Sequence, residues 1–281
     1  MKHLEFTKVV ASGNDFIILS GSGTSPTTTL DVKKKLPKNN LAELSKKLCN
    51  RRFSIGADGV MLLLKSKKAD LRMRIFNPDG SEADMCGNGL RCLALYAFKK
   101  GIGHKNLRIE TNAGILRARL VKNDYIRLEM TEPKTIRLDF NIHIDGVIHK
   151  VNFINTGVPH AVYFVKDLDN FDVKHIGQKT RFHEEFRPEG TNADFVEILD
   201  SKNIKIRTYE RGVEDETLSC GTGTVAGAIV AGLLKNIEAP ISVHTRSGEI
   251  LKVDFKKDDV SVNGVTMEGK AKIVFEGRIN I

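Results

Sequence analysis

The same short sequence, Cys-Gly-x-Gly, occurs in both halves of this 281-residue chain. It begins at Cys86 and again at Cys220, and each copy follows acidic and polar residues and leads into an apolar stretch. Glycine and small polar residues are common where a helix begins, and apolar residues then continue its buried face. The two copies therefore predict two half-sites that face one another, each offering a thiol and a helix N-terminus.

The stretches that follow the two cysteines are apolar on nearly every face. They cover residues 90–98 and 225–234. A helix that is apolar all round must be buried, and both stretches are shorter than the roughly 20 residues that span a bilayer. We therefore expect two buried helices, each enclosed by strands of its own half.

The repeat extends beyond the cysteines. Residues 56–62 resemble residues 191–198, which matches Asp58 with Asp194. In both halves a further strand follows, then an acidic loop, and then the cysteine. Internal similarity of this kind predicts two pseudo-equivalent domains.

We place the first domain at residues 1–131 and the second at residues 132–267. Residues 268–281 include a last strand, and we expect this segment to return to the first domain.

Most of the remaining elements are predicted to be strands, because short runs rich in Ile, Val and Phe are bounded by Gly, Asn, Asp or Pro. The predicted strands cover residues 16–19, 60–64, 71–76, 107–110, 125–130, 161–165, 195–198, 204–209, 250–255 and 271–275. A helix is predicted over residues 41–50 from its leucine spacing. A flexible surface loop is predicted over residues 20–29. Many strands around few helices indicate an α+β protein.

The formal net charge of +9 raises the question of nucleic-acid binding. The lysines are scattered in small clusters, however, and the chain has no Trp and only four Tyr. Single-strand binders interleave aromatic and basic residues, and this chain does not. A solvated basic surface is the better interpretation, and we expect no nucleic-acid partner.

The compartment and the metal content are predicted from the remaining composition. Glu5 and Lys8 interrupt any apolar core at the N-terminus, so we expect no signal peptide and no membrane association. Four cysteines in a chain of this length do not form a disulfide scaffold, and they lack the paired spacing of a zinc site. The sequence thus predicts a cytoplasmic protein without a metal.

Two thiols at helix N-termini favour a particular chemistry. The field of the helix is expected to lower the thiol pKa, and the first backbone N–H groups can bind a carboxylate. If two such halves faced each other, one sulfur would lie on each face of the same α-carbon. One thiolate and one thiol would then invert that centre as base and acid, without a cofactor.

Other interpretations of the cysteines are open from the residues alone. Cys49 and Cys92 are expected to fill space in the core, as buried cysteines often do. A disulfide between Cys86 and Cys220 would be an oxidised, inactive form in a cytosolic protein.

Several motifs, in order along nearly the whole chain, resemble the diaminopimelate epimerase family of PLP-independent amino-acid epimerases and racemases. In the first half they are Ser12-Gly-Asn-Asp-Phe16, Ile75-Phe-Asn-Pro-Asp-Gly-Ser-Glu82, Cys86-Gly-Asn-Gly89 and Thr111-Asn-Ala-Gly114. In the second half they are Asn155-Thr-Gly-Val-Pro-His160, Thr191-Asn-Ala-Asp-Phe195, Tyr209-Glu-Arg-Gly212 and Glu216-Thr-Leu-Ser-Cys-Gly-Thr-Gly223.

The resemblance implies a fold of two pseudo-symmetric domains, each a mixed, mostly antiparallel β-sheet or barrel wrapped around a central buried helix. It also implies roles for individual residues. Four are implied in catalysis, as the acid–base pair and its supports: Cys86, Cys220, His160 and Glu210. The others are implied in holding the carboxylate and amino groups of the substrate: Asn14, Asn77, Gly87, Asn88, Asn192, Glu210, Arg211, Gly221 and Thr222. From the residues alone, the favoured interpretations are a loop histidine satisfied by backbone for His160 and a surface carboxylate for Glu210.

Two residues depart from the family pattern. Val158 stands where many members carry a substrate-contacting Asn, and Gly59 where some carry a Gln. Both concern the distal end of the substrate and leave the cysteine chemistry unchanged.

The expected activity is the interconversion of LL- and meso-2,6-diaminopimelate in lysine biosynthesis, by a homodimer. The alternatives are a proline or hydroxyproline type racemase or epimerase, and a non-catalytic thiol-redox or binding protein.

Overall fold

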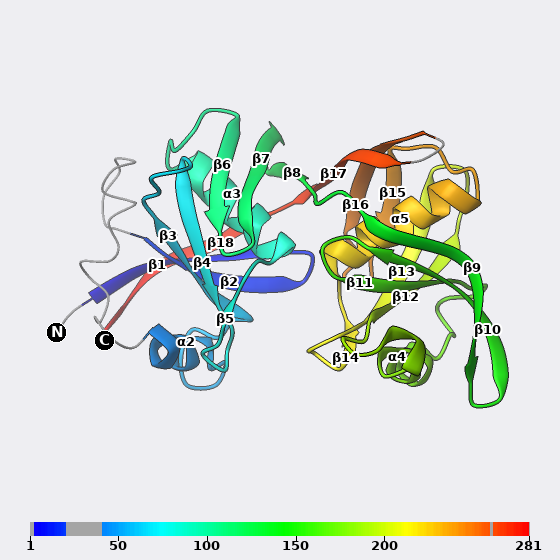
Figure 1. The fold of residues 1–281 in the computed structure, drawn as a ribbon. Helices are drawn as coiled ribbons and strands as arrows, with labels where there is room; N and C mark the ends of the chain where they lie inside the picture. The colour runs from blue at the N-terminus through cyan, green and yellow to red at the C-terminus, as the bar shows by residue number, and fades with distance from the viewer. Residues whose placement is uncertain (1–2, 21–40, 259–260, 281) are drawn as a thin grey trace. The chain divides into compact units, whose positions relative to one another are not determined.

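The computed structural model describes residues 3–20, 41–258 and 261–280, which divide into two compact units (Figure 1). Unit 1 consists of Met1–Leu128 and Gly269–Ile281, and unit 2 of Glu129–Glu268. The surface loop expected over residues 20–29 lies outside the described residues, apart from Ser20.

Unit 1 is a strongly curved, mainly antiparallel sheet with two described helices. Its elements are β1 (His3–Ala11), β2 (Asn14–Leu19), α2 (Leu41–Cys49), β3 (Gly59–Leu64), β4 (Leu71–Phe76), β5 (Glu82–Ala83), α3 (Gly87–Lys99), β6 (Asn106–Thr111), β7 (Gly114–Lys122), β8 (Tyr125–Glu129) and β18 (Lys272–Asn280). The strands are hydrogen-bonded in the order β18-β1-β2-β3-β4-β6-β7-β8, and β5 also pairs with β4. Only β2–β3 and β4–β6 are parallel among these pairs.

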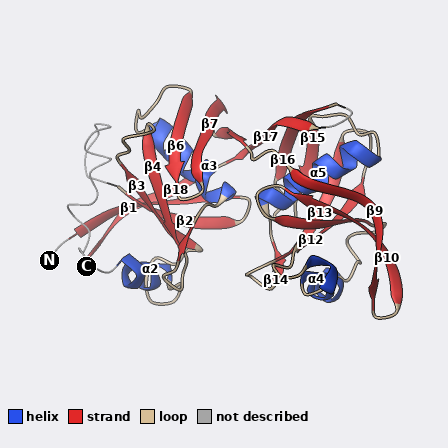
Figure 2. Cartoon of the chain, in the orientation of Figure 1, coloured by secondary structure: helices blue, strands red, loops and turns tan. Residues whose placement is uncertain are grey.

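The core of unit 1 is built around α3, as its all-round apolar sequence predicts. Ten of its residues, from Asn88 to Ala97, are buried. The helix contacts β1, β2, β7 and β18, and Figure 2 shows strands on more than one side of it. These strands hold α3 in place, and with it the position of Cys86, the residue just before the helix.

Unit 2 contains a second set of strands with two α-helices. Its elements are β9 (Lys134–Ile144), β10 (Val147–Asn155), β11 (Pro159–Phe164), α4 (Val173–Arg181), the 3-10 helix η2 (Glu184–Phe186), β12 (Asn192–Ile198), β13 (Asn203–Glu210), β14 (Asp215–Thr217), α5 (Gly221–Leu234), β15 (Ile241–His244), β16 (Ile250–Lys257) and β17 (Val262–Lys270). The strand order is β9-β10-β11-β12-β13-β15-β16-β17, with β14 on β13. The buried α5 contacts β10, β11, β12 and β16.

The two units share one topology. Each has eight strands in sequence across the sheet, with parallel pairs at the third and fifth junctions, a short extra strand before the cysteine, and a buried helix after it. The predicted fold class, pseudo-symmetric mixed sheets around central buried helices, is confirmed.

The pairing registers correct one detail of the predicted repeat. Ile75 on β4 faces Met61 on β3, whereas its counterpart Thr208 on β13 faces Asp194 on β12. The counterpart of Asp194 is therefore Met61, three residues after Asp58. The two Ala-Asp pairs are a coincidental match, since strand pairing, rather than local sequence, decides which residues are equivalent.

The sequence located most of the central strands and missed several outer ones. The predicted strands coincide with or overlap β2, β3, β4, β6, β8, β11, β12, β13, β16 and β18, and the helix predicted over residues 41–50 is α2. The strands β1, β5, β7, β9, β10, β14, β15 and β17, helix α4 and the 3-10 helix η2 had no prediction. The strands β7 and β9 are mostly exposed, and their charged side chains are interspersed with apolar ones. In β9 every second residue from Ile136 to Ile144 is apolar, which is a strand signal that the predictions overlooked.

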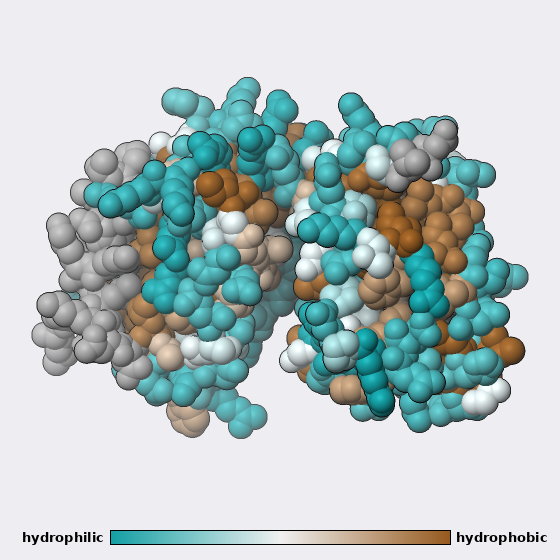
Figure 3. Space-filling view, viewed as in Figure 1, coloured by the Kyte–Doolittle hydropathy of each residue, from teal (hydrophilic) through white to brown (hydrophobic). Residues whose placement is uncertain are grey.

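Figure 3 shows hydrophilic side chains over much of the viewed face of each unit, interrupted by smaller apolar areas. Within residues 3–20, 41–258 and 261–280, no helix is both long and apolar enough to cross a bilayer.

Candidate active site

The first half-site is built at the start of α3. Cys86 is the N-cap of this helix in extended backbone conformation, and its Sγ accepts a hydrogen bond from the Gly89 N–H at 3.5 Å. The side chain is partly exposed, unlike the buried Cys49 and Cys92. The thiol therefore lies at the positive end of the helix dipole, beside first-turn N–H groups that have no intrahelical acceptor.

The predicted residues Asn14 and Asn88 are brought together in unit 1. The amide of Asn88 donates to Asn14 Oδ1 at 2.7 Å, and Asn14 donates to Asp58 Oδ2 at 3.1 Å. Arg91, which is fully buried, donates to Asn88 Oδ1 at 2.6 Å and to Ser12 Oγ at 2.7 Å. This chain of hydrogen bonds holds both asparagine side chains in fixed orientations beside the first turn of α3.

Asn77 directly follows β4, in the turn that leads to β5. Its side chain donates to Ser81 Oγ at 3.0 Å, and its backbone N–H donates to the Ser81 carbonyl at 2.8 Å. The structure therefore places Asn77 on the same unit as Asn14, Asn88 and Cys86, with its amide oriented by the turn.

The second half-site is built at the start of α5. Cys220 is the N-cap and is buried, with its Sγ 3.4 Å from Thr222 Oγ1. Thr224 donates to the Cys220 carbonyl from both its N–H and its hydroxyl, at 2.9 and 2.8 Å. These bonds fix the backbone from which the thiol projects.

The thiol pKa of Cys220 differs from the sequence-based expectation. We expected the helix N-terminus to lower it. Burial instead raises the pKa of Cys220 well above its ordinary value, and the carboxylates of Glu210 and Asp194 raise it further. The helix effect is outweighed because the sulfur is desolvated beside negative charge, so Cys220 is a neutral thiol in this structure near pH 7.

Two more predicted residues lie on strand ends of unit 2. Asn192 begins β12 and is buried, and its amide donates to the Pro159 carbonyl at 3.0 Å while its Oδ1 accepts from the Arg211 N–H at 2.8 Å. Glu210 ends β13, and burial raises its pKa. It is thus not the surface carboxylate that the residues alone allowed.

His160 is the fourth predicted catalytic residue and is fully buried on β11. Its Nδ1 lies 2.7 Å from Asp194 Oδ2, and Asp194 Oδ1 accepts from Thr208 Oγ1, also at 2.7 Å. Within the described part of the chain, His160 Nε2 is buried and has no hydrogen-bond partner. The alternative of a loop histidine satisfied by backbone is therefore wrong.

The comparisons with known proteins agree with this geometry. The family model described as diaminopimelate epimerase matches residues 6–136 and 152–274. The chain is 40% identical to the diaminopimelate epimerase of Aquifex aeolicus, over 99% of this chain and 98% of that protein. It is also 40% identical to that of Methanocella arvoryzae, over 100% of this chain and 98% of the other. The chain belongs to the diaminopimelate epimerase family.

Solved structures of other families share the fold at low sequence identity. A PhzF-family phenazine biosynthesis protein from Bacillus anthracis has a TM-score of 0.75 at 20% identity and covers 100% of both chains. A hydroxyproline epimerase from Agrobacterium vitis has a TM-score of 0.64 at 16% identity and covers 99% of this chain and 92% of that one. These likenesses establish the fold alone.

The two departures from the family pattern occupy related positions in the two units. Phe16 is the counterpart of His160 in unit 1. Val158 stands two residues before His160, and Asn14 stands two residues before Phe16, so Val158 is the counterpart of Asn14. Gly59 pairs with Phe16, as Asn192 pairs with His160, so Gly59 is the counterpart of Asn192. Each departure therefore removes a polar side chain from a position where the other unit has asparagine.

Gly59 is also sterically constrained. A Cβ at this position would lie 3.0 Å from the Phe76 carbonyl oxygen and 3.3 Å from the Phe16 ring. A longer residue therefore requires β3 or Phe16 to shift, which means that glycine here is part of the local packing.

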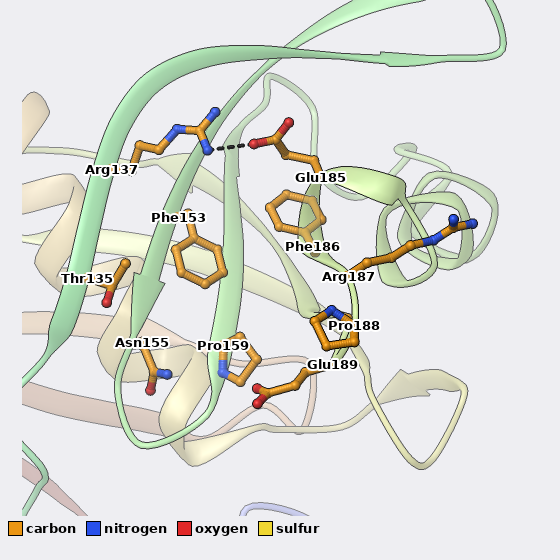
Figure 4. Close-up of a pocket in the computed structure, with 11 residues that line it drawn as sticks. Thr135, Arg137, Phe153, Asn155, Pro159, Glu185, Phe186, Arg187, Pro188 and Glu189 are labelled. Carbon is orange, nitrogen blue, oxygen red and sulfur yellow. Dashed lines mark hydrogen bonds and ion pairs between the residues drawn. The ribbon is translucent and has the colours of Figure 1, made fainter.

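Unit 2 also has a cavity of about 320 Å³ beside β10 and η2 (Figure 4). Phe153, Phe186 and Pro188 form part of its lining, and its charges include the Arg137–Glu185 ion pair at 2.5 Å. None of the four predicted catalytic residues lines it. Two of its lining residues are bonded to predicted binding residues: the Pro159 carbonyl accepts from the Asn192 amide, and the Glu189 carbonyl accepts from Arg211 Nη1 at 3.2 Å.

Sequence reasoning missed three polar residues that organise these half-sites: Arg91, Asp194 and Thr208. Arg91 and Asp194 each interrupt an otherwise apolar buried segment, and a charged residue in such a segment must have a partner. That signal was present in the sequence, but the partners come from other strands and could not be identified from it.

Proposed function

We propose that the protein interconverts LL- and meso-2,6-diaminopimelate by proton transfer at one α-carbon, without a cofactor. The observation that carries this proposal is the repetition of one arrangement in both units. In each, a cysteine caps a buried helix whose first turn is glycine-rich. Membership of the diaminopimelate epimerase family supports the choice of substrate.

In the proposed mechanism Cys86 and Cys220 act on opposite faces of the α-carbon. One sulfur removes the α-proton as a thiolate while the other donates a proton as a thiol, and the roles exchange in the reverse reaction. Because the pKa of Cys220 is raised, we assign it the thiol and Cys86 the thiolate in the resting enzyme. The two half-sites would close around the substrate, since a carbanion-like centre must be kept from water.

The first-turn N–H groups of α3 and α5 suit the carboxylate on the reacting carbon, where negative charge develops during proton removal. Gly87 and Asn88 provide these groups in unit 1, and Gly221 and Thr222 in unit 2. Asn14, Asn77, Asn192, Glu210 and Arg211 would hold the remaining amino and carboxylate groups. An arginine suits a carboxylate because its planar fork can donate two parallel hydrogen bonds.

The test is α-proton exchange in deuterated water with Cys86→Ser and Cys220→Ser. Each variant is expected to lose at least about 100-fold in the rate of deuterium incorporation, because each lacks one of the two proton-transfer groups. Cys49→Ser is the matched control, since Cys49 is a buried cysteine on α2 outside both half-sites. Wild-type rates in either site variant would contradict the two-base mechanism.

Substrate choice is tested by measuring LL-diaminopimelate beside proline and hydroxyproline. The proposal expects exchange with diaminopimelate only. Exchange with a cyclic amino acid at a comparable rate would instead favour a racemase of the proline type.

The same proposal treats residues 1–131 with 268–281, and residues 132–267, as the two catalytic halves. Action in the cytoplasm as a homodimer stays a prediction, and sedimentation analysis of the purified protein would measure the assembly.

A further inference from the structure

Asp194 forms a buried polar cluster with His160 and Thr208 on three adjacent strands. All three side chains are at most 3% exposed. One oxygen of the carboxylate accepts from Thr208, and the other bonds His160 Nδ1, both at 2.7 Å. Because both oxygens are engaged by neighbours on packed strands, the carboxylate cannot rotate without losing a hydrogen bond.

The start of α5 is fitted closely onto this cluster. A Cβ at Gly223 would lie 2.4 Å from Asp194 Oδ1 and 3.3 Å from the Cβ of Cys220. The carboxylate is therefore in contact with the first turn of the helix that Cys220 caps. The cluster therefore lies against the helix turn that follows the predicted catalytic Cys220.

Unit 1 lacks the cluster, although its fold is the same. The counterpart of Asp194 is Met61, and the counterpart of Thr208 is Ile75. A Cβ at Gly89, the counterpart of Gly223, would lie 3.1 Å from the Met61 sulfur and 3.3 Å from Ile75 Cδ1. The counterpart of His160 is Phe16.

The shared fold of the two units does not by itself explain the polar cluster of unit 2. Apolar residues fill these positions in unit 1, so the shared fold does not require a buried carboxylate there. Burying a carboxylate is costly unless it is fully hydrogen-bonded. The polar cluster therefore calls for an explanation in the chemistry of the second half-site.

The geometry points to Asp194 as a positioning residue that fixes the tautomer and ring orientation of His160 in the second half-site. This inference rests on the proposed function. The carboxylate accepts the proton on Nδ1, so that Nε2, buried and without a partner among the described residues, keeps its lone pair when the ring is neutral. That nitrogen is the one through which His160 acts on the thiol or on a substrate ammonium.

Carboxylates on two neighbouring strands act on His160. Asp194 faces it from β12 and Glu210 acts on it from β13, while Cys220 on α5 feels both carboxylates. The cluster therefore makes the two half-sites unequal, because it is present near Cys220 and its counterpart positions in unit 1 are apolar.

The test is Asp194→Asn. Thr208 would keep donating to the amide oxygen, so the NH2 group would face Nδ1, and the ring would have to carry its proton on Nε2 instead. We expect the nitrogen-15 spectrum of histidine-labelled protein to show this change of tautomer for His160. The signals of His160 are identified by their absence from the spectrum of His160→Gln. We expect kcat to fall roughly 10- to 100-fold with KM nearly unchanged, a smaller loss than the ~10⁴-fold effect of the same change in a serine-protease triad, where the histidine is itself the base.

Thr208→Val is the contrasting variant, because it removes the other hydrogen bond of the carboxylate and leaves the bond to His160. It is expected to lower the urea midpoint of unfolding and to keep the Nδ1–H tautomer. The inference is overturned if Asp194→Asn keeps that tautomer, if it keeps the wild-type kcat, or if Thr208→Val switches the tautomer as well. The spectrum needs no substrate, so a wild-type protein that failed to exchange the α-proton of diaminopimelate would refute the proposed function separately.

Discussion

Gly223→Ala is expected to destabilise the protein far more than the equivalent change in unit 1. The added methyl group would lie 2.4 Å from Asp194 Oδ1 and 3.2 Å from its Cγ, so the carboxylate or the helix must move by nearly an ångström. Asp194 is fully buried and holds two hydrogen bonds at 2.7 Å, so it cannot move without straining them.

The magnitude follows from two contributions. Overpacking a well-filled interior costs about 1–3 kcal/mol. Weakening a hydrogen bond to a buried charged group costs about 1.5–3 kcal/mol more. A helical Gly→Ala change returns roughly 0.5–1 kcal/mol through backbone entropy. The net expectation is a loss of about 2–5 kcal/mol in the free energy of unfolding.

Gly89→Ala is the matched control. Its methyl group would meet the Met61 sulfur at 3.1 Å and Ile75 Cδ1 at 3.3 Å, which are the ends of flexible side chains. We expect a change within about 1 kcal/mol, because methionine adjusts readily and the helix gains from alanine. Urea unfolding followed by circular dichroism measures both variants. Equal stabilities of the two variants would refute the reasoning that the rigid carboxylate sets the difference.

Two further predictions concern charge and oxidation. Although burial opposes it, hydrogen bonds and charge from Arg51 and Lys8 lower the pKa of Asp15 to about 2. A carboxyl with a lowered folded-state pKa stabilises the protein above its unfolded pKa of 3.8, and this stabilisation is lost as the pH falls toward 2. In Asp15→Asn the urea midpoint of unfolding should therefore fall less steeply as the pH is lowered from 5 to about 2. The same pH dependence as in the wild type would contradict the assignment. In the second prediction, mild oxidant without substrate joins Cys86 to Cys220 and abolishes activity reversibly. Peptide mapping checks the bond, and reversible inactivation without that disulfide would argue against facing thiols.

The sequence was sufficient for the features that depend on local pattern. The all-round apolar runs predicted α3 and α5, and the repeated Cys-Gly-x-Gly placed a thiol at the start of each. Both outcomes follow from burial and helix capping, which act over a few residues.

The sequence was insufficient where strand pairing decides the result. Asp58 and Asp194 are followed by similar residues, yet the ladders make Met61 the counterpart of Asp194. The raised pKa of Cys220 likewise depends on its burial and on carboxylates that lie on β13 and β12. Such distances between strands cannot be obtained from a single sequence.

The duplicated fold and its unequal interiors answer two different requirements of a two-base reaction. Inversion needs two similar half-sites, so that a sulfur and a helix N-terminus approach each face of the α-carbon in the same geometry. It also needs unequal protonation, since one sulfur must hold a proton while the other lacks it. The shared topology supplies the first requirement. In the proposed reaction, the second is met by the burial of Cys220 together with the carboxylates of Glu210 and Asp194, which all raise its thiol pKa. In unit 1, Met61 takes the position of Asp194, so that position holds an apolar side chain. In this chain, therefore, divergence beneath the two helices matters as much for the proposed reaction as the repeat itself.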